Sequence, residues 1–221
     1  MSGSGRLRDY GDAAGFVQGA IAAFLLLFVA ATPSFAETRT IVAYGDSLMA
    51  GYQLKPGEGF APQLEKALRA KGISARVVSG AVSGDTTAAG KARVAWVLGG
   101  MKTKPDLVIL GLGANDMLRG LPPAQARANL DAMIADFKKR GSKVLVAGML
   151  AAPNLGKAYA TEFNGMYPAL ARKHAVPLYP FFMKGVVANK ALLLGDGMHP
   201  NPAGVSVIVK GILPSVEAAL R

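Results

Sequence analysis

Cysteine is absent from this 221-residue sequence, and several kinds of chemistry are excluded with it. The chain can form no disulfide, carry no lipid on cysteine, and offer no thiolate as a nucleophile or a metal ligand. Histidine is nearly absent as well, since the sequence holds only His174 and His199. A reaction that needs an imidazole base must therefore use one of these two residues.

Aromatic residues make up 7% of the chain, and Trp96 is its single tryptophan. Trp96 falls in a stretch with helical periodicity, so we expect it in the hydrophobic core. Aromatic and basic residues do not interleave in a strip, which is the pattern that marks many nucleic-acid surfaces. We therefore expect no nucleic-acid partner.

Long apolar runs are also scarce, and the longest lies near the N-terminus. Gly19–Ala31 is apolar over 13 residues, follows two arginines and ends shortly before Pro33. Small residues at positions 34 and 36 complete the pattern of a secretory signal peptide that is cleaved after Ala36. The alternative, an uncleaved membrane anchor, needs about 20 apolar residues. The sequence thus predicts a signal peptide at 1–36 and a single domain at 37–221 without a stable membrane anchor. In a bacterium, this domain is exported to the periplasm or secreted.

Acidic residues are outnumbered, with 14 against 25 basic residues and a net charge of +11. The four charges in 1–36 cancel, so the excess belongs to 37–221. A basic surface favours encounters with anionic partners, and we expect transient contact with anionic lipid. The densest basic run, 138–140, precedes Gly141, where the C-terminus of a helix prefers cations. We also expect the protein to be a monomer.

Apolar, β-branched runs alternate with segments of helical periodicity along 39–220. This alternation predicts an α/β fold, in which helices cover both faces of a parallel sheet. Ligands of such sheets bind beyond the carboxyl ends of the strands. The expected strands are 40–44, 75–79, 106–112, 143–148 and 176–179, and the expected helices are 60–70, 88–98, 124–140, 159–174 and 202–220.

Four short blocks fall where this edge of the sheet is expected. Ser47 follows the first expected strand, Gly84 the second and Asn115 the third. Asp196 and His199 lie in the loop that opens the last expected helix, and this loop can return to the same edge. The sequence therefore predicts that these segments converge.

Ser47 and His199 are suited to be the nucleophile and the base of an acyl-transfer site. A serine hydroxyl is a weak nucleophile until a base accepts its proton. His174 stands among cations at an expected helix end, which leaves His199 as the base. Asp196 can accept the imidazole Nδ1–H, so that Nε2 faces Ser47. On its own, the Asp-x-x-His spacing is also that of an Asp-capped turn.

Gly84 and Asn115 are candidates for an oxyanion hole. A glycine leaves its N–H open to a substrate oxygen, and Asn115 offers a neutral donor. The alternative roles are a turn glycine and an Asx turn at the end of the third strand. Asp46 and Asp116 are expected to stabilise turns, because the side chains of neighbours in an extended segment point to opposite faces.

Together the blocks resemble the GDSL/SGNH hydrolase superfamily, whose Ser, Gly, Asn and His occur in this order. The resemblance spans nearly all of 39–220 and is greatest to its secreted bacterial thioesterases, lysophospholipases and arylesterases. It implies a flavodoxin-like three-layer α/β/α sandwich with a five-stranded parallel sheet, small-molecule ester and thioester substrates, and no metal or organic cofactor. The segments that carry it are 43–52, 83–86, 113–120 and 176–183.

The resemblance also implies a role for each site residue. Ser47 is the nucleophile, His199 the base and Asp196 its partner. The N–H groups of Ser47 and Gly84, with the Asn115 side chain, form the oxyanion hole.

Acyl binding is expected from a loop at 117–123 and from the segment 149–155. The second segment is rich in alanine, so aryl and short-chain acyl esters suit it at least as well as long-chain thioesters. The residues expected to bind substrate are Met117, Leu118, Leu121, Leu150, Leu155 and Met198.

Two alternatives to this esterase or thioesterase stay open. One is a carbohydrate O-acetyl esterase, which would use the same machinery. The other is a non-catalytic acyl- or lipid-binding protein of the periplasm, which would have no use for the five site residues.

Overall fold

The computed structural model describes residues 1–3 and 37–221, and its folded unit runs from Thr38 to Arg221. The expected signal segment and its cleavage site fall in 4–36, outside the described residues. Export therefore stays a prediction.

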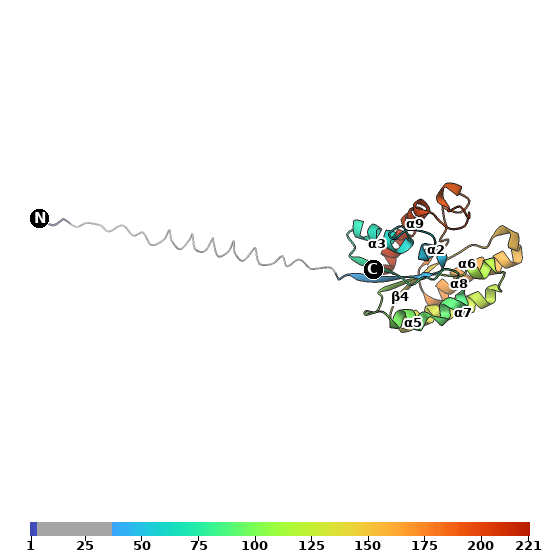
Figure 1. Cartoon of the computed structure of the whole chain (residues 1–221). Coiled ribbons are helices and arrows are strands. Elements are labelled where there is room, and N and C mark those ends of the chain that lie inside the picture. Colours follow the sequence, from blue (N-terminus) through green and yellow to red (C-terminus); the bar gives the residue numbers. More distant parts are fainter. Residues whose placement is uncertain (4–36) are drawn as a thin grey trace. The chain divides into compact units, whose positions relative to one another are not determined.

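Strands and helices alternate along the described chain (Figure 1). The strands are β1 (Arg39–Gly45), β2 (Ala75–Ser79), β3 (Leu107–Gly111), β4 (Lys143–Ala147) and β5 (Leu178–Tyr179). The helices are α2 (Ser47–Ala50), α3 (Phe60–Ala70), α4 (Thr87–Ala92), α5 (Val94–Gly99), α6 (Ala114–Leu118), α7 (Pro123–Lys139), α8 (Lys157–His174) and α9 (Pro202–Leu220), with 3₁₀ turns at Pro153–Leu155 and Lys190–Leu192.

The strands described form one parallel five-stranded sheet in the order β2-β1-β3-β4-β5. This order is that of flavodoxin-like folds, and the predicted architecture is confirmed. The chain proceeds outward from β1 in one direction to β2 and in the other direction to β3. The carboxyl ends of β1 and β3 therefore flank a switch point, which is where such sheets bind ligands.

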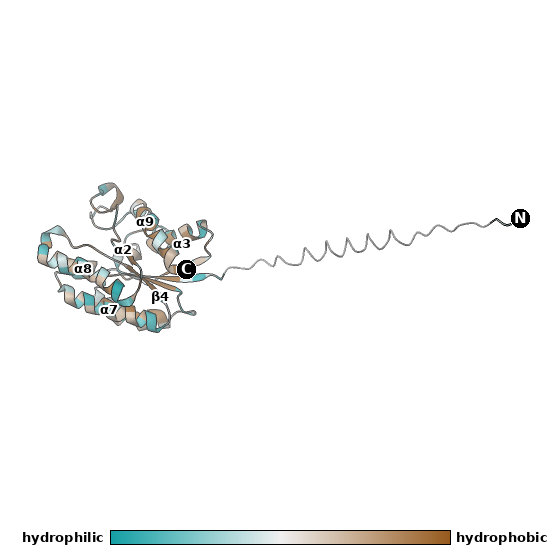
Figure 2. Cartoon of the chain, turned by 180° about the vertical axis from the view of Figure 1, so that it is seen from behind, coloured by the Kyte–Doolittle hydropathy of each residue, from teal (hydrophilic) through white to brown (hydrophobic). Residues whose placement is uncertain are grey.

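Side chains of β1 alternate between two hydrophobic cores, one on each face of the sheet. Ile41 and Ala43 pack with α3 and α9, while Val42 and Tyr44 pack with α7 and α8. Figure 2 shows the apolar strands of the sheet between helices that are apolar on part of their surface. Burial on both faces explains why the strands appear in the sequence as continuous apolar runs.

The expected helix at 88–98 is two helices, because the chain turns at Arg93 between α4 and α5. The Arg93 N–H bonds to the Gly90 carbonyl, three residues earlier, instead of the residue four earlier that an α-helix requires. The short helices α2 and α6 were not predicted, since a single turn leaves no periodic pattern to detect.

Trp96 is 78% exposed on α5, so its predicted place in the core is wrong. Periodicity located the helix but not the face that it buries, and Val94 is the buried residue of α5.

α9 is long and apolar enough to cross a membrane. However, Val205, Ile208 and Ile212 of α9 are buried in the core beside α3.

The single tryptophan makes this exposure measurable in the intact protein. We expect Trp96 fluorescence in the native state to have the red-shifted emission of a hydrated indole and to be quenched by iodide, because the side chain is largely in water. The guanidinium-unfolded protein is the control and should show a similar emission maximum. A blue-shifted native spectrum that iodide does not quench would place Trp96 in the core after all.

Candidate active site

Ser47 stands at the first position of α2, directly beyond the carboxyl end of β1. Asp46 caps this helix, since its Oδ1 accepts a hydrogen bond of 3.1 Å from the Leu48 N–H. Gly45 allows the close approach that the turn needs, because a Cβ there would lie 2.7 Å from the Gly111 carbonyl oxygen. Ser47, the predicted nucleophile, is therefore held in place by a glycine and by the buried Asp46 carboxyl group, which stabilises the turn as expected.

The His199 imidazole lies between Ser47 and Asp196. His199 Nε2 is 2.9 Å from Ser47 Oγ, and Nδ1 is 2.7 Å from Asp196 Oδ2. An ionised carboxylate can only accept, so the proton belongs on Nδ1 and Nε2 is free to accept the serine hydroxyl proton. The geometry is that of a nucleophile, a base and a group that orients the base.

Asp196 is held in its charged form by hydrogen bonds. Its Oδ1 accepts the backbone N–H groups of His199 at 3.0 Å and Met198 at 2.9 Å. These bonds, followed by the one from the His199 side chain, lower the pKa of Asp196 to about 2. The carboxylate therefore stays negative at any pH where an imidazole can act as a base.

Donors for an oxyanion converge beside Ser47. Gly84 has a φ of +86°, a conformation that L side chains rarely adopt, and no atom lies within 4 Å of where its Cβ would be. Within the described part of the chain, the backbone N–H groups of Ser47 and Gly84 have no protein acceptor. The Asn115 side chain follows β3 and donates to the Asp85 carbonyl at 2.9 Å through Nδ2, which has a second N–H.

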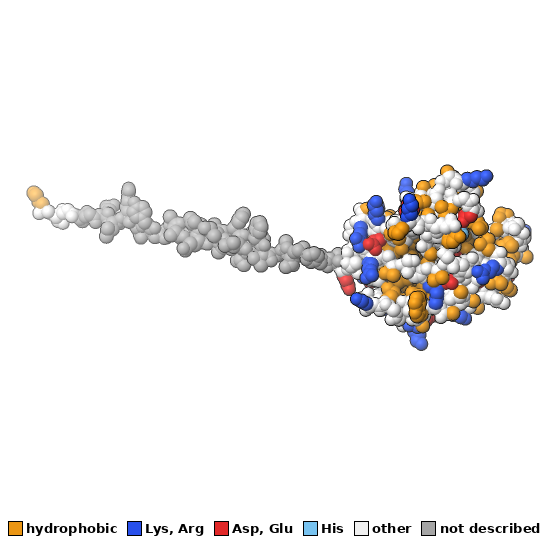
Figure 3. Space-filling model, in the orientation of Figure 1, with side chains coloured by type: hydrophobic (Ala, Val, Ile, Leu, Met, Phe, Trp, Pro, Cys, Tyr) orange, Lys and Arg blue, Asp and Glu red, His pale blue; other side chains and the backbone are white. Residues whose placement is uncertain are grey.

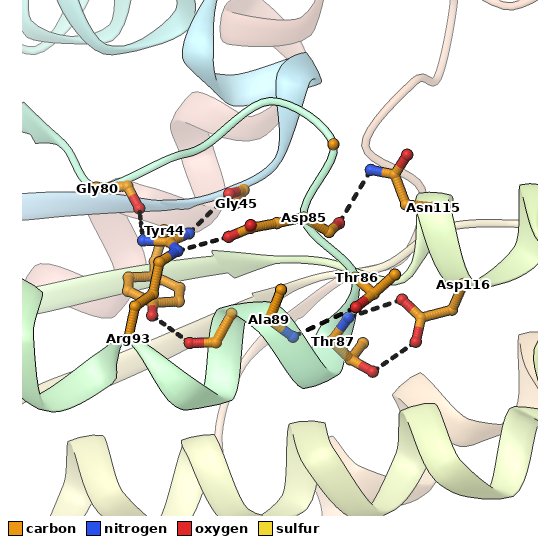
Figure 4. Close-up of polar contacts among 12 residues, drawn as sticks. Tyr44, Gly45, Gly80, Asp85, Thr86, Thr87, Ala89, Arg93, Asn115 and Asp116 are labelled. Carbon is orange, nitrogen blue, oxygen red and sulfur yellow. Dashed lines mark hydrogen bonds and ion pairs between the residues drawn. The ribbon is translucent and has the colours of Figure 1, made fainter.

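The loop that carries Gly84 is fixed by the side chains of Asp116, on α6, and of Arg119, the C-cap of α6; Figure 4 shows the contacts of Asp116. Buried Asp116 accepts the backbone N–H of Thr87 at 2.7 Å and its hydroxyl at 2.6 Å. Arg119 donates to the Gly84 carbonyl at 2.9 Å. Asp116 thus stabilises this corner, in keeping with its expected structural role.

A cavity of about 600 Å³ opens onto Ser47, a size usual for small-molecule sites. Met117, Leu118, Leu150 and Met198, four of the residues predicted to bind substrate, are among those that line it. The full lining consists of Ser47, Leu48, Tyr52, Ser83, Gly84, Ala114, Asn115, Met117, Leu118, Met149, Leu150, Ala151, Ala152, Pro153, Phe181, Met183, Val187, Leu193, Gly197, Met198 and His199.

Leu121 and Leu155, which were also predicted to bind substrate, are not among the residues that line this cavity. The Leu121 carbonyl accepts the Tyr159 hydroxyl at 3.0 Å in the turn before α7. Leu155 ends a 3₁₀ turn and packs against the core on the α7 and α8 face. Both leucines were predicted to bind substrate because they belong to apolar segments. In a turn, however, successive side chains point in different directions, so only some of them face the cavity.

Several cavity residues were missed. The Tyr52 ring lies 4.5 Å from the His199 ring, centroid to centroid. Phe181 and Met183 follow β5 and could have been found, since they come after a strand at the same edge of the sheet. Val187 and Leu193 lie in irregular chain before α9, where no periodicity gives a signal.

His174, the second histidine, lies outside the cavity and contacts Asp131. His174 is the last residue of α8, and its Nε2 lies 2.6 Å from a carboxylate oxygen of Asp131 on α7. Hydrogen bonds from Lys173 and then His174 lower the pKa of Asp131.

In the described residues, no group of three His, Asp or Glu side chains is placed to hold a metal ion.

Comparisons with known proteins give a consistent result. A model of the GDSL-like lipase/acylhydrolase family matches residues 43–207. An arylesterase of Vibrio mimicus is 38% identical over 178 residues, which cover 80% of this chain and 88% of that protein. The esterase TesA of Pseudomonas aeruginosa is 36% identical over 185 residues, or 84% of this chain and 91% of that protein. The crystal structure of AlinE4, an SGNH-hydrolase family esterase, is 46% identical with a TM-score of 0.72, and the match covers 85% of this chain and 100% of that one.

Asp46 is 1% exposed, and this burial raises its pKa to about 7 from the ordinary 3.8. Between these two values the folded state keeps a proton that the unfolded state releases. The free energy of unfolding therefore falls as pH rises through this range and levels off above it.

Asp46→Asn should remove this loss of stability. The variant keeps an oxygen for the Leu48 N–H and has no proton to lose, so its stability relative to wild type should rise between about pH 4 and 7. Urea unfolding at a series of pH values measures the difference. Asp136→Asn, which removes a partly exposed carboxylate of α7 that pairs with Arg140, controls for net charge. Parallel curves for wild type and Asp46→Asn would contradict the assignment.

Proposed function

The chain belongs to the GDSL-like lipase/acylhydrolase family and is a carboxylic ester hydrolase, and on this premise we propose that it acts through an acyl-enzyme on Ser47. The proposed substrates are aryl esters and esters of short- to medium-chain acyl groups, with thioesters of similar size. The observation that carries the proposal is the His199 imidazole, which lies within hydrogen-bond distance of both Ser47 and Asp196.

In the first step, Ser47 Oγ attacks the acyl carbonyl carbon while His199 Nε2 accepts the hydroxyl proton. The carbonyl oxygen becomes an oxyanion. It receives hydrogen bonds from the N–H groups of Ser47 and Gly84 and from the second N–H of Asn115 Nδ2. Asp196 stabilises the imidazolium that forms, since its carboxylate remains negative.

In the second step, the intermediate collapses and His199 gives its proton to the departing alcohol or thiol. The acyl group stays on Ser47 Oγ. A water molecule that His199 deprotonates then attacks the acyl carbonyl. The bond between the acyl carbon and Ser47 Oγ breaks, His199 gives the proton to Ser47 Oγ, and the carboxylic acid leaves. Both half-reactions use the same three oxyanion donors, so no group has to move between them.

The cavity supports an apolar acyl or aryl group. Among the described residues, five of the eight large hydrophobic side chains that are exposed line this cavity: Tyr52, Leu118, Leu150, Val187 and Met198. Such a concentration of exposed apolar surface is typical of a binding site. A carbohydrate would find few partners here for its hydroxyl groups, which favours the apolar acyl ester over the O-acetylated sugar.

We further propose that the enzyme is exported, on the strength of the signal-like sequence at 1–36, and that it acts as a monomer. Figure 3 shows lysine and arginine side chains spread over one face of the described domain and not gathered in a strip. This distribution supports transient contact with anionic lipid. On this face the basic side chains form no focused surface for nucleic acid.

Ser47→Ala should abolish hydrolysis of p-nitrophenyl acetate, because no other group can form the acyl-enzyme. The loss should be on the order of 10⁴-fold or more in kcat. A fluorophosphonate probe should label the wild type at Ser47, as mass spectrometry of peptides would show. Ser206→Ala, at an exposed serine of α9, is the matched control. Full activity of Ser47→Ala would remove Ser47 from the mechanism.

Leu118→Ser should reduce the preference for longer acyl chains, since Leu118 lines the cavity and is 61% exposed. A buried methylene contributes about 0.8 kcal/mol, so the kcat/KM ratio of p-nitrophenyl hexanoate to acetate should fall about 3- to 10-fold. Leu121→Ser, outside the cavity, should keep the wild-type ratio. Equal effects of the two substitutions would show that the cavity does not hold the acyl chain.

A further inference from the structure

Arg93, at the turn between α4 and α5, makes contacts that the mechanism above does not use. Its Nε donates to Asp85 Oδ2 at 2.5 Å, its Nη1 to the Gly80 carbonyl at 2.5 Å and its Nη2 to the Gly45 carbonyl at 3.0 Å. The guanidinium carbon lies 4.2 Å from the centre of the Tyr44 ring. One planar group therefore joins two backbone carbonyls and the Asp85 carboxylate (Figure 4).

Each of these acceptors lies next to an oxyanion donor or at the base of its loop. Gly45 is two residues before Ser47, Asp85 directly follows Gly84, and Gly80 begins the loop that carries Gly84. The Asp85 carbonyl also accepts the Asn115 side chain. All three donors of the oxyanion hole are thus connected through Arg93 and Asp85.

The connection matters because the donors come from separate segments. The loop after β2 is bonded to β1 by the backbone bonds Gly80 N–H to Ala43 O and Val82 N–H to Gly45 O. Neither bond involves Gly84 itself. Arg93 adds a link through Asp85, and a displacement of about 1 Å at a donor is enough to cost about 10²-fold in rate.

The chemistry of the link requires arginine. The Arg93 and Asp85 side chains are 14% and 12% exposed, so each charge needs the other. A guanidinium presents its donors in a fixed plane, whereas the ammonium of lysine is a point charge on a flexible stem. Lysine could keep the ion pair with Asp85 but could not hold both carbonyls in the same geometry.

We propose that Arg93 is a positioning residue of the oxyanion hole, which sets the distance between the Ser47 and Gly84 N–H groups. This inference rests on the proposed function. It predicts that Arg93 contributes to binding of the tetrahedral transition state and not to binding of the planar substrate.

Arg93→Lys is the test. We expect kcat for p-nitrophenyl butyrate to fall by about 10- to 100-fold, with KM within about threefold of wild type. Affinity for an alkyl trifluoromethyl ketone, which adds Ser47 to form an oxyanion, should fall by the same factor as kcat. Affinity for the matching methyl ketone, which stays planar, should not change.

Arg69→Lys is the matched control. Arg69 also pairs with a carboxylate, Glu65 at 2.8 Å, and donates to a backbone carbonyl, that of Ala75 at 3.2 Å. These contacts lie at the opposite end of β2 from Gly80. Arg69→Lys should therefore keep wild-type kcat and wild-type affinity for both ketones.

Asp85→Asn provides a second variant if Arg93→Lys does not fold. It keeps the Asp85 backbone and replaces the charged acceptor of Arg93 Nε with a neutral one, while the two carbonyl acceptors of Arg93 remain. A smaller loss of kcat with the same pattern of ketone affinities is therefore expected. Wild-type kcat and ketone affinities in either folded variant overturn the proposal. So does an equal loss of both affinities, or failure of both variants to fold, since these results indicate a purely structural role.

Failure of the proposed role of Arg93 can be distinguished from failure of the proposed function. If the fluorophosphonate does not label wild-type Ser47, the acyl-enzyme mechanism fails. If it labels Ser47 and the variants show no selective loss of trifluoromethyl ketone affinity, only the role of Arg93 fails.

Discussion

The reversal of strand order between β1 and β3 is the constraint on which the site depends. Chains that leave two neighbouring parallel strands toward opposite sides of the sheet cannot fill the space beyond the strand ends, so a crevice remains there. Ser47 enters this crevice from β1 and Asn115 from β3. The capping of α2 by Asp46 and the approach of Gly45 to Gly111 then determine how the serine is presented.

Charge is distributed in the site according to burial. Asp196 lies near the surface, where backbone N–H groups keep it ionised beside the base. Asp46 is buried and favours its neutral form at mildly acidic pH, while buried Asp85 is paired with Arg93. A negative charge next to an oxyanion would oppose the reaction, so neutral or compensated carboxyl groups suit the positions around the donors.

The sequence was informative wherever a residue's role depends on its neighbours along the chain. The buried strands, the helices at 60–70 and 202–220, and the order Ser47, Gly84, Asn115, His199 follow from periodicity, strand ends and motif. Roles that depend on which way a side chain points were not predictable. Trp96 was misplaced for this reason, and Leu121 and Leu155 do not line the cavity. Arg93 went unnoticed because its acceptors lie in two segments that are far apart in the sequence.

The hydrogen bond between Ser47 and His199 joins residues that are 152 positions apart, at the first strand and just before the last helix. No nascent chain that lacks His199 can assemble the site, so the polypeptide is inert until that residue has been synthesised and folded against Ser47. Measured activity therefore indicates that the first strand and the segment before the last helix have folded together. Two fragments divided in an exposed turn, each inactive alone, could serve as the halves of a complementation reporter.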